Sequence, residues 1–304
     1  MSTVLSINNL TKFYGRIRAL HDVSFEVPEG SVFGILGPNG SGKTTMLGII
    51  MDILKASSGN YLWKGEPGSA KMRQQIGTLL ETPNFYHYLS GLKNLRIAAE
   101  IKQRGMEDIE KVLQLVNLWQ RKDSKFNTYS LGMKQRLAIA STLLGNPDIM
   151  VFDEPTNGLD PAGIAEIRDL IRQLNGQGKT IIMASHILDE VEKVCTHVAI
   201  IQKGELKADG SVKDILDTKK ADETVIEIAA DDLPALQNII GQINGLLEVT
   251  VADHQLQVVF SNGITAQEVN RFCFEKGIVL SKLNVKRRSL ETTFLEITGT
   301  KSER

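Results

Sequence analysis

The stretch Gly37-Pro-Asn-Gly-Ser-Gly-Lys-Thr-Thr45 has the residue types and spacing of a phosphate-binding loop. Its glycines allow the backbone to turn tightly and to aim successive N–H groups at an anion. A helix that begins there adds a partial positive charge at the same point. Lys43 could then reach the β- and γ-phosphates of a nucleotide, and the Thr44 hydroxyl could ligate Mg²⁺. The alternative is a glycine-rich surface turn with a chance lysine.

The residues on either side of this loop decide between the two interpretations. The apolar run 32–36 predicts a buried strand before the loop, and residues 46–50 predict a helix after it. A strand, a glycine-rich turn and a helix form the context in which this motif binds phosphate. The sequence therefore favours the phosphate site.

Two acidic residues, Asp153 and Glu154, follow another apolar run at 148–152. Unpaired carboxylates at the end of a buried strand are costly, so packing alone does not explain them. In a Mg²⁺-nucleotide site, Asp153 would hold the metal shell and Glu154 would orient or deprotonate the attacking water. His186 ends the next predicted strand, 180–185, where ligands of open α/β sheets bind, and its imidazole could hydrogen-bond the γ-phosphate.

Three further candidates are open to a purely structural interpretation. Tyr14 lies on a short loop after a predicted strand, where it could stack on a base or simply pack in the core. From 91 to about 145, apolar residues recur at spacings of three and four, which predicts a helical subdomain inserted in the α/β core. Ser130 and Gly132 begin its last helix, where they could form a second phosphate site or a plain helix cap.

The composition is that of a globular protein with no electrostatic reason to bind nucleic acid. Of 304 residues, 42% are hydrophobic and 23% are charged, and the formal net charge is −1. Cys195 and Cys273 lie far apart in apolar contexts, which favours buried free thiols. Neither a secretory signal nor an apolar run of roughly 18 residues is visible, so we expect the chain to be soluble by itself.

Together these motifs resemble an ABC-type ATP-binding cassette, and the resemblance covers about Val4 to Leu216. It implies an α/β fold, the P-loop NTPase core of ABC type, that binds ATP and Mg²⁺ and hydrolyses the ATP. Glu154, His186 and Lys43 would be its catalytic residues. The matched positions are Tyr14 at the adenine-stacking aromatic, Gly37, Pro38, Asn39, Gly40, Ser41, Gly42, Lys43, Thr44 and Thr45 in Walker A, Ser130 and Gly132 in the signature, Asp153 and Glu154 in Walker B, Asp160 in the D-loop and His186 as the switch histidine.

The resemblance also implies partners. Two cassettes of this family are thought to sandwich two ATP molecules, each signature loop meeting the γ-phosphate held by the opposite Walker A. This chain carries one of each motif, so we expect a homodimer or a second cassette, together with a separate transmembrane permease. The chain would lie in the cytoplasm, bound to the inner face of the cell membrane through the permease only.

Two departures from the general pattern point to a narrower group. Leu131 and Met133 replace a glycine and a glutamine of the signature, and Glu81 stands at the usual Q-loop glutamine. Both departures resemble the ATPases of bacitracin- and lantibiotic-type exporters, which implies export of an antimicrobial peptide or drug. Glu81 is expected to be a metal-side ligand, and an exposed loop glutamate without a role is the alternative.

Aromatic residues crowd the chain just beyond Glu81, where this family docks the cytoplasmic helix of the permease. Packing within the helical subdomain would explain them equally well. The residues concerned are Phe85, Tyr86, Tyr88 and Leu89.

The sequence predicts two domains. The cassette is expected over 1–218, with its helical subdomain at about 85–145, and the polar stretch 217–223 is the expected linker. Over 219–304 the predicted order β-α-β-β-α-β suggests a small ferredoxin-like α+β domain, closed by a helix at 289–297. No catalytic group stands out in this accessory domain.

Two other function classes fit parts of the pattern. Cassettes that act on ribosomes usually come as two in one chain, and DNA-repair cassettes carry long heptad arms. This chain has one phosphate loop and no heptad run. A kinase or GTPase would share the phosphate loop but would lack the signature stretch and His186. The sequence therefore favours a transporter subunit.

Overall fold

The computed structural model describes residues 2–80, 84–217, 223–252, 254–261, 264–286 and 289–299. Glu81 and residues 218–222 of the expected linker lie outside the described residues. Contacts within the chain divide it into two units, Met1–Ile215 with Phe294–Arg304, and Leu216–Thr293. No helix in the described ranges is long and apolar enough to cross a membrane.

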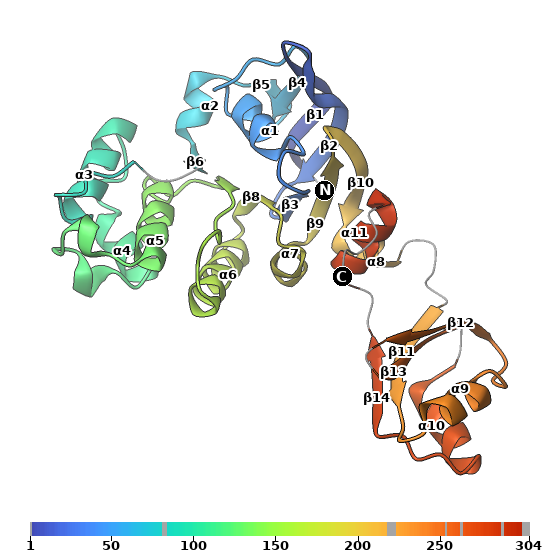
Figure 1. Cartoon of the computed structure of the whole chain (residues 1–304). Helices are drawn as coiled ribbons and strands as arrows, with labels where there is room; N and C mark the ends of the chain where they lie inside the picture. The colour runs from blue at the N-terminus through green and yellow to red at the C-terminus, as the bar shows by residue number, and fades with distance from the viewer. Residues whose placement is uncertain are drawn as a thin grey trace. The chain divides into compact units, whose positions relative to one another are not determined.

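The first unit contains a mainly parallel sheet with the strand order β10-β9-β3-β8-β7-β6 (Figure 1). Every residue of β3, β7 and β8 is buried, as expected of parallel strands that are covered on both faces. Because β3, β8 and β7 are parallel neighbours, their carboxyl ends meet at one edge of the sheet. The strands are β3 (Val32–Leu36), β6 (Ile76–Leu79), β7 (Ile149–Asp153), β8 (Thr180–Ser185), β9 (His197–Gln202) and β10 (Glu205–Ser211).

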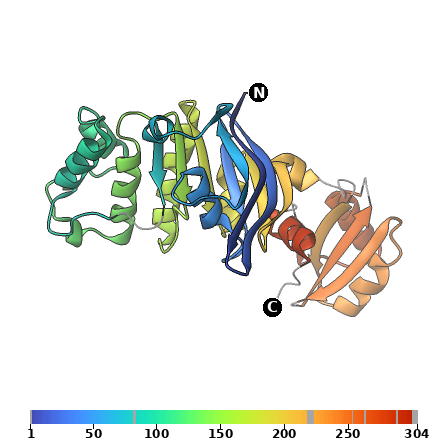
Figure 2. The ribbon, with the colours of Figure 1, turned by 90° about the horizontal axis from the view of Figure 1, so that it is seen from above.

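An antiparallel sheet, in the order β2-β1-β4-β5, lies beside helix α1 (Lys43–Ile50) and the main sheet (Figure 2). Buried side chains of both sheets and of α1 form one hydrophobic core. Trp63 is buried in this core, and its indole N–H donates to the carbonyl oxygen of Ile50 at 3.1 Å. The core fixes the start of α1, and with it the phosphate-loop segment. The strands are β1 (Thr3–Tyr14), β2 (Ile17–Pro28), β4 (Ser58–Trp63) and β5 (Glu66–Pro67).

Between β6 and β7 the chain forms the predicted helical insertion (Figure 1). Leu95, Leu113 and Leu137 are fully buried and come from its three α-helices. The ammonium of Lys102 donates to the carbonyl oxygen of Ser141 at 2.7 Å near the end of the third helix, and burial lowers the pKa of Lys102 to about 8. The helices here are α3 (Gly91–Lys102), α4 (Ile109–Leu115) and α5 (Leu131–Thr142); the others are α2 (Ala70–Gln74), α6 (Pro161–Gly176), α7 (Leu188–Val194) and α8 (Val212–Asp217).

The second unit has the predicted β-α-β-β-α-β order and an antiparallel sheet in the order β12-β13-β11-β14. This is the ferredoxin-like arrangement. Its core includes Ile226, Leu236, Val258 and Val269, which come from two of the strands and from both helices. The elements are β11 (Glu223–Ala229), α9 (Leu233–Ile240), β12 (Leu246–Ala252), β13 (Gln255–Ser261), α10 (Ala266–Glu275) and β14 (Lys282–Lys286). Helix α11 (Leu290–Thr298) follows them, and its residues from Phe294 on belong to the first unit.

Candidate functional site

The glycine-rich stretch forms the loop between β3 and α1, as the sequence predicted: β3 ends at Leu36 and α1 begins at Lys43. Gly40 and Gly42 have φ angles of +77° and +108°, in the left-handed region that favours glycine. A Cβ atom on Gly42 would lie 2.6 Å from the carbonyl oxygen of Ala19, so only glycine fits. Helix α1 has no side-chain cap, which leaves the amides of its first turn to a ligand or to water.

This loop lines a cavity of about 310 Å³. Glu154 reaches it from the end of β7, and Ala19, which sequence reasoning missed, contributes a wall from β2. Amide donors, an ammonium and a hydroxyl all face a space large enough for phosphate groups. The lining residues are Ala19, Asn39, Gly40, Gly42, Lys43, Thr44, Thr45 and Glu154.

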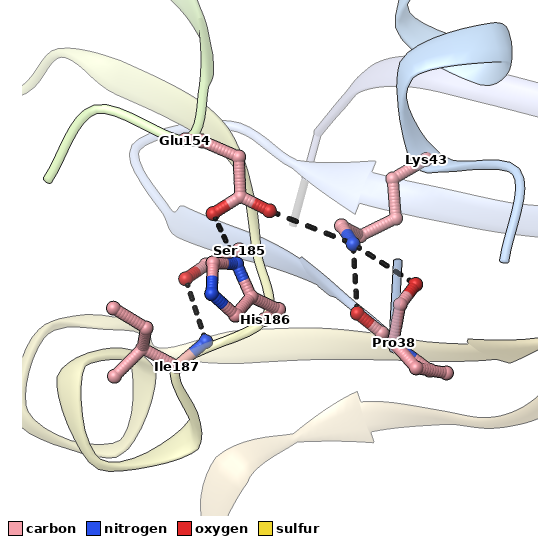
Figure 3. A network of polar contacts seen from close by, with 7 residues as sticks. Pro38, Lys43, Glu154, Ser185, His186 and Ile187 are labelled. Carbon is pink, nitrogen blue, oxygen red and sulfur yellow. Dashed lines mark hydrogen bonds and ion pairs between the residues drawn. The ribbon is translucent and has the colours of Figure 1, made fainter. Parts of the chain in front are cut away.

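Lys43 is at the centre of a polar network (Figure 3). It is only 5% exposed, and its ammonium donates to the carbonyl oxygens of Gly37 at 2.7 Å and Pro38 at 3.3 Å. The carboxylate of Glu154 lies 3.5 Å from the same ammonium. A buried ammonium needs such acceptors, and phosphate oxygens could replace them.

Glu154 is held on its other side by His186, whose Nδ1 lies 2.8 Å from the second carboxylate oxygen (Figure 3). Glu154 has a φ of +48°, which is rare for a residue other than glycine. Its N–H donates to the carbonyl oxygen of Ala184 at 3.0 Å. Strained backbone of this kind clusters at functional sites. Because β7 and β8 are neighbours, the acid pair and His186 come together although they are separated by a long helix.

Asp153 ends β7 and is 6% exposed. Among the described residues, no group of three or more His, Cys, Asp or Glu side chains could hold a metal ion by itself. In nucleotide sites Mg²⁺ is bound by one or two protein groups together with phosphates and water. A Mg²⁺ ion that arrives with a nucleotide therefore needs no such group of three side chains. Glu81, the third expected metal ligand, lies outside the described residues.

Ser130, Gly132 and Asp160 line a different cavity, of about 380 Å³, whose lining shares no residue with that of Lys43. Ser130 caps α5, since its hydroxyl accepts from the N–H of Met133 at 3.2 Å, and Asp160 caps α6 by accepting from Gly163 at 2.9 Å. The helix-cap interpretation of Ser130 thus holds within the chain. The chain presents its signature and its Walker A to separate spaces.

Tyr14 ends β1 and is 45% exposed, so it is not a core residue. The ammonium of Lys12 lies 5.1 Å from the centre of its ring. Tyr14 does not belong to the described lining of the Lys43 cavity. An exposed ring is free to stack, but within the chain its contact is with a lysine.

Phe294, from the predicted closing helix, is a site neighbour that sequence reasoning missed. It lines a hollow of about 290 Å³ with His186 and with the first residues of Walker A. The sequence predicted a helix at 289–297, but no sequence signal indicated what that helix would meet. The lining residues are Gly37, Pro38, Asn39, His186, Leu188 and Phe294.

The family model, the related sequences and the solved structures that this chain resembles all concern ATP-binding proteins of ABC transporters. Residues 20–157 match the ABC transporter family model. The chain is 38% identical to the uncharacterized ABC transporter ATP-binding protein YhcH of Bacillus subtilis, over all of this chain and 98% of that one. It is 34% identical to the bacitracin transport ATP-binding protein BcrA of Bacillus licheniformis, over 98% of each chain. Among solved structures, the dimeric post-hydrolysis state of the ATP-binding cassette MJ0796 with ADP and Pi is 28% identical, with a TM-score of 0.61 over 68% of this chain and 98% of that one.

The network around Lys43 predicts the effect of removing its charge. We expect Lys43→Ala to weaken ATP binding by about 100-fold, because the variant loses a charge-assisted contact to the phosphates. Isothermal titration of the full chain with ATP measures this. Lys71→Ala, at an exposed lysine of α2, is the matched control and should bind as the wild type does. Equal affinities in both variants would contradict the placement of the phosphates.

Proposed function

The chain belongs to the ABC transporter family, as an ATP-binding protein, and we propose that it drives export through a separate membrane-spanning permease by hydrolysing ATP in the Lys43 cavity. The observation that carries the site assignment is the Lys43–Glu154–His186 network, in which Lys43 begins α1 after β3 and the other two residues follow β7 and β8. In it a buried ammonium lies beside a carboxylate whose other oxygen contacts an imidazole, and this combination supports phosphate binding and activation of water.

The roles of the three residues follow from their contacts. Lys43 exchanges the carbonyl oxygens of Gly37 and Pro38 for oxygens of the β- and γ-phosphates. Glu154 then orients the attacking water and accepts its proton. His186 holds one oxygen of Glu154 at 2.8 Å, which leaves the other oxygen to face the cavity. Hydrolysis of the γ-phosphate is the reaction this arrangement supports.

Mg²⁺ fits the donors that lie near the phosphates. Thr44 lines the cavity with a hydroxyl, and Asp153 offers a carboxylate at the end of β7. Hard oxygen donors of this kind suit Mg²⁺. Thr44 and Asp153 would hold the ion, with Glu81 as a further ligand on the metal side. When bound, the ion would neutralise charge on the phosphate oxygens.

Two chains in head-to-tail contact would complete two ATP sites. Each chain carries the Lys43 cavity and, separately, the cavity of Ser130 and Asp160. We infer that the second cavity faces the γ-phosphate bound by the other chain, or by another cassette. The related cassette MJ0796 has a dimeric structure, which supports the pairing of two cassettes.

The proposed permease contact is the pair of exposed rings Tyr86 and Tyr88, which are 49% and 67% exposed with ring centres 6.0 Å apart. Asn94, which is buried, fixes this turn because its amide oxygen accepts from the N–H of Tyr86 at 2.8 Å. Phe85 packs instead on Phe126, with ring centres 5.2 Å apart. Rigid, exposed aromatic residues suit a docked helix. Through it the chain would lie on the inner face of the cell membrane.

The relatives also suggest a substrate class. BcrA of Bacillus licheniformis is a bacitracin transport protein by name, and it aligns over nearly the whole of this chain. We infer that the exported compound is an antimicrobial peptide or a drug, selected by the permease.

Replacing the proposed water-orienting carboxylate tests the function directly. Glu154→Gln should bind ATP within about twofold of the wild type but hydrolyse it at least about 100-fold more slowly, because the amide cannot accept the proton of water. Phosphate release by the full chain measures turnover. Glu110→Gln, at an exposed residue of α4, is the matched control. Near-normal turnover in Glu154→Gln would remove Glu154 from the reaction.

The docking proposal predicts a loss of assembly without a loss of ATP binding. Tyr86→Ala with Tyr88→Ala should reduce co-purification with the permease by about tenfold, because two aromatic contacts across the proposed interface are lost. Ile101→Ala removes a side chain that is 78% exposed on α3 of the same helical insertion, and it should leave the complex intact. If the double variant co-purifies as the wild type does, the permease binds elsewhere.

A further inference from the structure

We propose that Phe294 is a positioning residue for ATP hydrolysis: it closes one side of the hollow beside His186 and so keeps the imidazole on Glu154. The inference rests on the proposed function, because it concerns the same Glu154–His186 pair. It gives the C-terminal helix a part in turnover, although that helix follows the accessory unit in sequence.

The first observation is the hollow itself. Its volume is about 290 Å³, and Phe294 faces His186, Leu188 and the start of Walker A across it. Phe294 belongs to the first unit, so all the residues that line the hollow come from the same unit. The side chain of His186 is 36% exposed and is therefore open to competition from water. An aromatic wall limits both the entry of water and the alternative rotamers of the imidazole.

The second observation is that the end of α11 is attached beside Walker A. The side-chain amide of Gln202 donates to the carbonyl oxygen of Thr298 at 3.2 Å. The hydroxyl of Thr298 in turn donates to the carbonyl oxygen of Phe294 at 2.7 Å. Gln202 ends β9, which pairs with β3 directly before Gly37. A Cβ atom on Gly37 would lie 2.2 Å from the carbonyl oxygen of Ile201, so strand and loop are in tight contact.

The third observation is that residues lining the hollow also contact Lys43 and Glu154. Gly37 and Pro38, which line it, supply the carbonyl oxygens that hold Lys43, and His186 holds Glu154. Phe294 carries no polar group on its side chain, so it can act only through these neighbours. We therefore expect it to affect turnover through His186 rather than the binding of phosphate.

The test compares full-chain variants by ATP affinity and by turnover. Phe294→Ala should lower kcat by about fivefold and leave the ATP Kd within about twofold, because His186 loses its aromatic wall on that side while Lys43 keeps its contacts. Phe294→Leu keeps an apolar wall and should recover most of the rate. Phe274→Ala, at a phenylalanine that is 71% exposed on α10, is the matched control and should turn over as the wild type does.

A double-mutant cycle separates positioning from general destabilisation. If Phe294 acts through the imidazole, Phe294→Ala should have no further effect on kcat in a His186→Ala background. Gln202→Leu, which removes the donor to Thr298, should lower kcat in the same direction and keeps the test valid if Phe294→Ala does not fold. Wild-type kcat in both Phe294→Ala and Gln202→Leu, or additive effects with His186→Ala, would overturn the inference.

The same experiment distinguishes this inference from the proposed function. A wild-type chain without ATPase activity, or a Glu154→Gln chain that retains it, would contradict the proposed function. A wild-type chain whose activity depends on Glu154, together with a fully active Phe294→Ala chain, would contradict only the role of Phe294.

Discussion

A buried ammonium group must be surrounded by acceptors, and the site is arranged around the one on Lys43. Two carbonyl oxygens of its own loop and the carboxylate of Glu154 surround it. Phosphate oxygens are stronger acceptors than peptide carbonyls, so ATP can displace the two carbonyls without leaving the charge unpaired. The loop is thereby prepared for an anion before one arrives.

The strand order makes this arrangement possible. Residues far apart in sequence meet because β3, β8 and β7 are parallel neighbours that end at the same edge. The tight contact between Gly42 and Ala19 links this edge to the antiparallel sheet. Ser130 and Asp160 do not lie at this site: they line a separate cavity, which shares no lining residue with that of Lys43. Under the proposed function, these two separate cavities would each be completed by another cassette.

The sequence could predict whatever depends on local pattern. The apolar run before Gly37, the glycines after it and the polar ending of β7 each identify a strand end, and the resemblance supplied the ABC fold. The left-handed backbone of Glu154 and the carbonyls on Lys43 could not be predicted, because they depend on how neighbouring strands align. Phe294 was missed for a related reason: its helix has an apolar face, but the surface that it covers is distant in sequence.

Under the proposed function, the ATP site at Lys43 of one chain is completed by the signature of another. Light scattering on the Glu154→Gln chain, in which ATP should persist, tests it most directly. We expect a particle of one chain, 33.6 kDa, without nucleotide and of twice that mass with saturating ATP and Mg²⁺. A single-chain mass at saturating ATP, with ATP binding verified in the same sample, would contradict it.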